Sequence, residues 1–187
     1  MSLTRFDFAS LPVTPWRNGG GETREIACWP PGAQDFDWRA SIATIAQDGP
    51  FSAFSGIDRS ITLLEGDGVR LFSAGQIDHH LSQVGEPFAF SGDVALKATL
   101  LGGSSQDFNI MTRRGRLAAR VQRVTTATLL PGQHAGVLYV LEGRWAVADG
   151  VTLAAGEGGW WAAGVHSGSL TPLTEESVIL WADITPG

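Results

Sequence analysis

Short hydrophobic stretches separated by turn-forming residues dominate this chain. Apolar residues rarely recur at the three-to-four-residue spacing of a helix face, and they gather instead in short runs between clusters of Gly, Pro, Asp and Ser. We therefore predict an all-β fold, arranged as a sandwich or a barrel. The predicted strands are Leu11–Val13, Thr23–Cys28, Trp38–Ile45, Arg59–Glu65, Val69–Phe72, Phe88–Phe90, Ala95–Leu101, Phe108–Arg113, Ala118–Val124, Ala127–Leu130, Ala135–Leu141, Trp145–Val147, Gly159–Trp161, Gly168–Pro172 and Ser177–Asp183.

A weak internal repeat organises these strands. Ile61–Gly66 resembles Leu138–Gly143, because each segment is a strand that ends in Leu-Glu-Gly. In both places a second strand follows, and then a Gly-Glu element with aromatic residues, at Gly85–Phe88 and at Gly156–Trp161. The glycine that ends each Leu-Glu-Gly would accept the positive φ of a hairpin turn, and the aromatic residues would cap the mouth of a barrel.

This order of elements is typical of one half of a cupin, and its recurrence indicates a duplication. We predict a single double-cupin (bicupin) domain over residues 1–187, built from two degenerate cupin halves at about 1–115 and 116–187. The polar segment Gln76–Gln83 reads as a loop.

Composition narrows the classes of function. The net charge is −6 and Lys97 is the only lysine, so the clustered basic residues that nucleic-acid binding needs are missing. Cys28 is the only cysteine, which excludes a disulfide within the chain. No apolar run reaches the roughly 20 residues of a membrane helix, and residues 1–5 do not begin a signal peptide. We expect a soluble cytoplasmic protein with neither a nucleic-acid nor a membrane partner.

Five motifs in a fixed order carry a family resemblance. Trp16–Ile26 reads WRNGGGETREI and resembles the W-[KR]-N-G-G-G-x-T-x-E-I signature of the HutD/Ves family. The other four motifs are Phe36–Ala43, Gly49–Arg59, Phe90–Asp93 and Asp107–Gly115. Ser55 departs from the family pattern, which often has Pro at that position. Together the motifs cover roughly the first 120 residues.

The resemblance implies a bicupin fold. For the HutD branch it also implies an accessory or regulatory role in bacterial histidine utilisation, a pathway that passes through the small carboxylates urocanate and formiminoglutamate. The Ves branch is linked to stress responses. The family supplies no assigned enzymatic activity for this chain.

The histidines do not form the ligand set of a metal-dependent cupin, which uses an H-x-H pair, a carboxylate and a later His. His79 and His80 are adjacent, so on a strand they would point to opposite faces. His134 and His166 both lie at turns, and they are the one pair that could meet in the second half. We predict no metal and no other cofactor.

The glycine segment beside Trp16 has two interpretations. Consecutive glycines expose backbone N–H groups and let a ligand approach closely, with Asn18 adding an amide and Trp16 an apolar wall. The alternative is a structural crossover whose glycines relieve crowding.

Strand alternation separates two polar faces. On Trp38–Ile45, Arg39 and Ser41 share a face, and on Asp107–Arg113 the two end residues share a face with Asn109 and Met111. These faces point either to solvent or into a barrel mouth, where a few polar groups in an aromatic cavity would fix a small ligand. In the second case Arg39, Arg59 and Arg113 would clamp a carboxylate, and four aromatic residues would form the walls.

The candidate ligand-binding residues are therefore Trp16, Asn18, Gly19, Gly20, Glu25, Arg39, Ser41, Phe51, Phe54, Arg59, Phe90, Asp107, Asn109, Met111 and Arg113.

Our hypothesis is a metal-independent bicupin that binds a small carboxylate, such as formiminoglutamate or urocanate, and modulates histidine utilisation. One rival is an enzyme on related carboxylates with Glu25 or Asp107 as general base. Another is a protein-binding, Ves-type stress-response factor that uses the tryptophans of the second half. These tryptophans would form a core or the interface of a homodimer.

Overall fold

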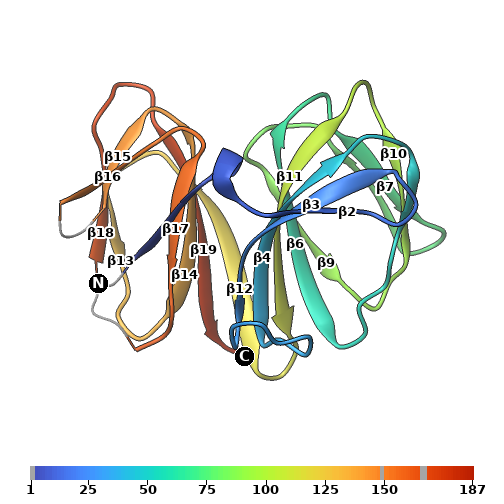
Figure 1. Cartoon of the computed structure of the whole chain (residues 1–187), viewed down its shortest axis with the longest axis horizontal. Coiled ribbons are helices and arrows are strands. Elements are labelled where there is room, and N and C mark those ends of the chain that lie inside the picture. The colour runs from blue at the N-terminus through green and yellow to red at the C-terminus, as the bar shows by residue number, and fades with distance from the viewer. Residues whose placement is uncertain (1–2, 148–149, 165–167) are drawn as a thin grey trace. The chain divides into compact units, whose positions relative to one another are not determined.

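The computed structural model describes residues 3–147, 150–164 and 168–187, and its regular secondary structure is almost entirely antiparallel strand (Figure 1). The chain forms two compact units, one of residues 12–118 with Gly187 and the other of residues 1–11 with 119–186. Helix within the described residues is limited to the 3₁₀ turn η1 (Phe8–Ser10). In that part of the chain, no helix is long and apolar enough to cross a membrane.

The unit of residues 12–118 contains two sheets. Its larger sheet has the spatial order β2 (Val13–Pro15), β3 (Gly21–Trp29), β4 (Trp38–Ile45), β11 (Ser105–Arg113), β6 (Ile57–Glu65) and β9 (Pro87–Ser91). Its smaller sheet has the order β5 (Gly49–Phe51), β10 (Leu96–Leu100), β7 (Val69–Ser73) and β8 (Ile77–Leu81).

The other unit also contains two sheets. One has the order β1 (Thr4–Asp7), β17 (Glu157–Trp161), β14 (Ala135–Glu142), β19 (Val178–Pro186) and β12 (Leu117–Val124). The second has the order β13 (Thr128–Leu130), β18 (Gly168–Pro172), β15 (Arg144–Val147) and β16 (Val151–Ala154).

The strand orders prove the duplication. Adding eight to each strand number converts β4-β11-β6-β9 into β12-β19-β14-β17, and it converts β5-β10-β7-β8 into β13-β18-β15-β16. The all-β fold built from two cupin-like halves is therefore confirmed, although in each unit the described strands form two separate sheets and not one closed barrel.

The Leu-Glu-Gly segments lie at equivalent places in this duplication. Gly66 and Gly143 follow β6 and β14 and have the expected positive φ, 103° and 76°. The hairpin expected at these turns is wrong, because β6 does not pair with β7, nor β14 with β15. At each glycine the chain leaves the larger sheet of its unit and enters the smaller one.

Alternation along the strands builds the core of the unit of residues 12–118. Ile45, Ile61 and Leu63 from the larger sheet pack with apolar residues of the smaller sheet, such as Leu71 and Ala98, so the two sheets pack face to face. Residues that share a strand face with this core therefore also point into the interior. This geometry directs the polar faces of β4, β6 and β11 inward.

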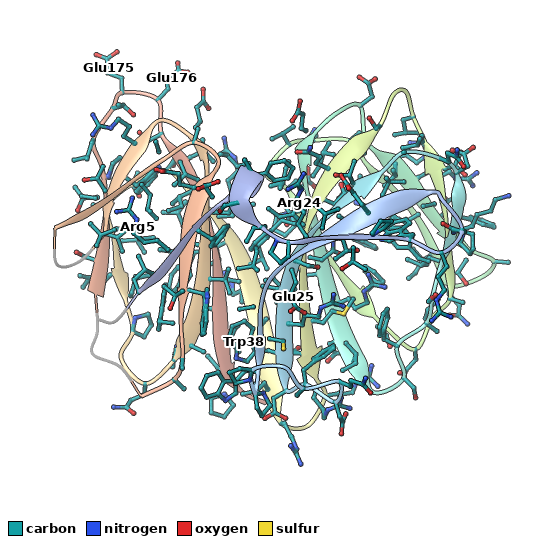
Figure 2. All side chains as sticks on the ribbon, in the orientation of Figure 1. Arg5, Arg24, Glu25, Trp38, Glu175 and Glu176 are labelled. Carbon is teal, nitrogen blue, oxygen red and sulfur yellow. The ribbon has the colours of Figure 1, made fainter. Side chains whose placement is uncertain are left out.

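Aromatic residues fill the core of the other unit. Trp145, Trp161 and Trp181 pack together with aliphatic residues from both of its sheets. All three are at most 5% exposed, so the described structure gives them the core role. Figure 2 shows the side chains that occupy the interior of each unit.

The sequence analysis missed strands only at sheet edges. The predicted loop at 76–83 is wrong, since it contains β8, which pairs with β7. The other strands without a predicted counterpart are β1, β5 and β16, each at an end of its sheet. An edge strand pairs on one side only, so its sequence carries less of the apolar alternation that identifies a strand.

Gly66 provides a test of the crossing between sheets. A β-carbon at Gly66 would lie 2.5 Å from the Ser104 carbonyl oxygen, on a backbone with φ of 103°. We expect Gly66→Ala to lower the free energy of unfolding by about 3 kcal/mol, because a left-handed backbone and an overpacked contact add. Gly75→Ala is the matched control, with φ of 74° and open space, and should cost about 1 kcal/mol. If urea unfolding gave the same loss of unfolding free energy for both variants, the close contact at Gly66 would be contradicted.

Candidate functional site

Cross-strand register brings the inward polar residues into rows. In the first row, Met111 on β11 lies opposite Arg39 on β4 and Arg59 on β6, and Arg59 in turn lies opposite Phe90 on β9. In the next row, Asn109 pairs with Ser41. Directly opposed side chains on one face lie close enough to interact. The larger sheet therefore presents a patch of arginine, amide and hydroxyl groups to the interior of its unit.

Arg59 is the central group of this patch. Its guanidinium carbon lies 5.7, 5.3 and 5.2 Å from the ring centres of Phe51, Phe54 and Phe90, within cation–π range. Its Nη2 atom donates a long hydrogen bond of 3.5 Å to the side-chain oxygen of Asn109, and its Nε atom has no partner. No carboxylate of the described residues pairs with it.

Burial makes this cation energetically unusual. Arg59 is 8% exposed. Desolvation, with a smaller contribution from the positive charge of Arg39, lowers the Arg59 pKa to about 10. A buried charge without a partner is costly, and an incoming anion would remove that cost.

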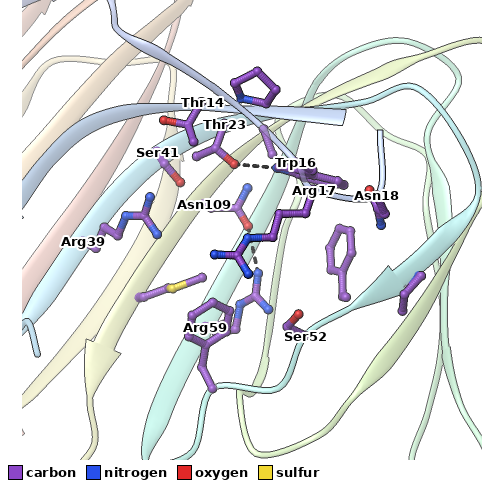
Figure 3. Close-up of a pocket in the computed structure, with 16 residues that line it drawn as sticks. Thr14, Trp16, Arg17, Asn18, Thr23, Arg39, Ser41, Ser52, Arg59 and Asn109 are labelled. Atoms are coloured by element: carbon purple, nitrogen blue, oxygen red, sulfur yellow. Dashed lines mark hydrogen bonds between the residues drawn. The ribbon is translucent and has the colours of Figure 1, made fainter. Parts of the chain in front are cut away.

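A cavity of about 490 Å³ opens beside Arg59 (Figure 3). The lining residues come from β2, β3, β4, β6 and β11, from the turn after β2 and from the segment around β5. They are Thr14, Pro15, Trp16, Arg17, Asn18, Thr23, Arg39, Ser41, Ala43, Pro50, Phe51, Ser52, Phe54, Arg59, Asn109 and Met111. This set contains three arginines and no acidic residue, so the cavity is suited to an anion.

The turn from Trp16 to Gly21 forms one wall of the cavity. The Gly19 N–H donates to the Trp16 carbonyl oxygen at 3.0 Å, and the Gly20 N–H donates to the Asn18 side chain at 2.8 Å. A β-carbon on Gly21 would lie 2.3 Å from the Thr44 carbonyl oxygen. The turn thus uses the Gly19 and Gly20 amides for its own hydrogen bonds, which supports the structural interpretation of the glycines.

The structure places nine of the fifteen candidate residues around the cavity. They are Trp16, Asn18, Arg39, Ser41, Phe51, Phe54, Arg59, Asn109 and Met111. Phe90 does not line it but packs against Arg59. That these residues bind a ligand stays a prediction.

The other candidate residues lie elsewhere. Gly19 and Gly20 belong to the turn. The Glu25 side chain is 44% exposed and pairs with Arg39, with 2.9 Å between Oε1 and Nε. Arg113 pairs with Asp35 and donates to a backbone carbonyl oxygen, so it does not reach the cavity. Asp107 is fully buried and is not among the lining residues.

Seven lining residues were not among the candidates. They are Thr14, Pro15, Arg17, Thr23, Ala43, Pro50 and Ser52. Arg17 stands inside the WRNGGG motif, and Thr23 and Ala43 share strand faces with chosen residues, so the sequence carried a signal for these three. Thr14 reaches the site because β2 pairs with β3, with Thr14 opposite Thr23. That pairing was not visible in the sequence.

Asp107 is a buried carboxyl group on the same inward face of β11. Its Oδ1 accepts a hydrogen bond of 3.1 Å from the Ser105 hydroxyl, and its Oδ2 has no partner. Burial raises the Asp107 pKa to about 7, against the smaller effect of the Ser105 hydrogen bond. The side chain therefore carries a proton over much of the acidic range.

The raised pKa predicts a pH-dependent stability difference. Between about pH 4 and pH 7 unfolded Asp107 is ionised while the folded residue keeps its proton, so folding is penalised as the pH rises. The unfolding free energy of the wild type, relative to Asp107→Asn, should fall through this window by up to about 1.4 kcal/mol per pH unit. Asp78→Asn is the control, because Arg70 lowers the Asp78 pKa and any effect has the opposite sign. A difference that is flat from pH 4 to pH 7 would show that Asp107 ionises normally.

The described residues offer no metal centre. No group of three or more His, Cys, Asp or Glu side chains there could hold a metal ion, and the cavity lining contains none of these residue types. His134 Nδ1 lies 2.8 Å from Asp183 Oδ1, so this ring is already paired. His166 lies outside the described residues.

Comparison of the sequence with known proteins identifies a family. The family model HutD matches residues 9–180. Protein Ves of Citrobacter koseri is 46% identical over 181 residues, covering 96% of this chain and 93% of that protein. Protein Ves of Cronobacter sakazakii is 44% identical over 182 residues, covering 96% and 97%.

Solved structures agree with the sequence relatives. HutD from Pseudomonas fluorescens SBW25 superposes with a TM-score of 0.85 at 29% identity, covering both chains completely. Oxalate decarboxylase from Lactobacillus farciminis shares the fold at a TM-score of 0.69 and 9% identity, covering 98% of this chain and 86% of that chain. With the match across most of its length, the chain belongs to the HutD family.

Proposed function

We propose that this protein binds a small carboxylate metabolite in the cavity beside Arg59, without a metal ion, as an accessory or regulatory factor of histidine utilisation. The observation that carries the proposal is the buried Arg59 guanidinium, which has no carboxylate partner among the described residues. A ligand carboxylate would supply the missing negative charge and would accept hydrogen bonds from the guanidinium N–H groups, including the unpartnered Nε–H.

The shape and lining of the cavity support a small ligand. Its volume of about 490 Å³ lies within the usual range of metabolite sites. Phe51, Phe54 and Trp16 provide apolar walls, and Trp16 is held in place because its indole N–H donates to Thr23 Oγ1 at 2.8 Å. Ser41 and Asn109 add polar groups that would orient the ligand.

The proposed biological role is drawn from the family. A role in histidine utilisation is consistent with membership of the HutD family. The structure of HutD from Pseudomonas fluorescens SBW25 is described as a formate condition, and formate is the smallest carboxylate. Intermediates and products of histidine breakdown are small carboxylates of a size that suits the cavity.

A thermal-shift screen tests the proposal. The purified protein is heated with urocanate, formiminoglutamate, formylglutamate, glutamate or formate, each with and without divalent metal ions. At least one acid should raise the melting temperature with increasing concentration and without metal, because a ligand that binds only the folded state stabilises it.

Arg59→Ala should abolish this rise. Arg70→Ala is the matched control, since Arg70 pairs with Asp78 and lies outside the cavity lining. An unchanged rise in the Arg59 variant would remove the proposed site, and a rise only with metal would contradict metal independence. If none of the acids changed the melting temperature, a protein partner would be favoured as the ligand.

The buried Asp107 favours one second candidate, an enzyme acting on a related carboxylate. An unpaired carboxyl oxygen and a pKa of about 7 suit a general base at neutral pH, but Asp107 does not line the cavity, so this candidate requires a substrate that reaches beyond the lining residues. Glu25 fits that role less well, because it is exposed and paired with Arg39. Turnover of formiminoglutamate or formylglutamate that Asp107→Asn removes, and Glu25→Gln retains, would establish this candidate; no turnover by the wild type would exclude it for these acids.

A further inference from the structure

We propose that Arg17 is a second cationic contact of the cavity, and that the ligand carries two separate anionic groups, one bound at Arg59 and one at Arg17. This inference rests on the proposed function, since it concerns the ligand of the same cavity. It adds a residue that specifies the class of ligand.

The turn that carries Arg17 is held by its own hydrogen bonds. Arg17 and Asn18 are the two central residues between Trp16 and Gly19, whose backbone groups are hydrogen-bonded at 3.0 Å. Gly19 completes the turn with φ of 73°. The Trp16 N–H also donates to the Gly21 carbonyl oxygen at 2.9 Å. These bonds fix the backbone from which the Arg17 side chain extends toward the cavity (Figure 3).

The charges around the cavity do not balance. Arg17, Arg39 and Arg59 line it, and no acidic residue does. Arg39 is compensated by its ion pair with Glu25. Neither Arg17 nor Arg59 has a carboxylate partner within the described part of the chain. Two positive charges therefore remain, and a ligand with one carboxylate would compensate only one of them.

The two arginines differ in exposure. Arg59 is buried between phenylalanine rings, whereas Arg17 is exposed. A single compact anion at the buried guanidinium would compensate only the charge of Arg59. A ligand with an anionic group at each end would place one in the phenylalanine-lined region and the other at the exposed Arg17.

Matched pairs of acids test this inference by calorimetry at low ionic strength. The pairs are succinate with butyrate, glutarate with valerate, and adipate with hexanoate, so each diacid is compared with a monoacid of equal carbon number. At least one diacid should bind about tenfold more tightly than its monoacid, as expected for an additional charge-assisted hydrogen bond. The ratio should shrink with added salt, because Arg17 is exposed.

Variants assign the effect to Arg17. Arg17→Gln should bring the ratio of the two affinities close to one, and Arg17→Lys should restore much of it by returning the charge. Arg123→Gln is the control, since Arg123 is also exposed and lies outside the cavity lining. Its ratio should equal that of the wild type.

The outcomes separate this inference from the proposed function. Monoacid binding that depends on Arg59, with no preference for any diacid, would overturn the two-anion inference and leave the carboxylate site intact. A diacid preference that survives in Arg17→Gln would overturn the role of Arg17. No binding of any of these acids, in a protein that also fails the thermal-shift screen, would overturn both.

Discussion

The buried guanidinium of Arg59 is the feature on which the site depends. Its strand face is shared with Ile61 and Leu63, so the pleat that forms the core also carries this cation into the interior. Three phenylalanine rings surround it, and the only hydrogen bond of its side chain within the described part of the chain is the long one to Asn109. Phenylalanine faces attract a cation but do not neutralise it. The fold therefore places an uncompensated charge beside an open cavity. An apolar residue at this position would not carry the energetic cost of that charge.

The duplication shows how one fold can serve two purposes. Both units repeat the same strand order, yet their interiors differ. In the unit of residues 12–118, arginine, serine and asparagine occupy inward positions beside the cavity. In the other unit, Trp145, Trp161 and Trp181 fill the interior. Large aromatic side chains bury much apolar surface, so the second core contributes stability where the first accommodates polar groups. Neither unit presents a metal-ligand cluster among its described residues.

Sequence patterns predicted most of this arrangement. Alternation grouped the residues that share the inward faces of β4 and β11 but left open whether these faces point inward, and the repeated Leu-Glu-Gly segments indicated the duplication. Prediction was weakest for features that depend on contacts between segments distant in the sequence. The edge strand β8 was read as a loop, and Arg113 was grouped with Met111 although its partner is Asp35. Alternation fixes which face a side chain shares, but the neighbour that it meets depends on the loops and on the opposing sheet. For the same reason alternation could not show that Asp107 is buried outside the cavity lining.

The free energy of unfolding of Arg59→Met, measured without any carboxylate present, shows whether the buried cation stabilises or destabilises the fold. Methionine keeps an unbranched apolar chain against the phenylalanine rings and removes the charge. If Arg59 is held for an incoming anion, the variant should be as stable as the wild type or more stable by about 1 kcal/mol, because an uncompensated buried cation costs stability. A loss of more than about 2 kcal/mol would show that the Arg59 guanidinium stabilises the fold and is not held for a ligand.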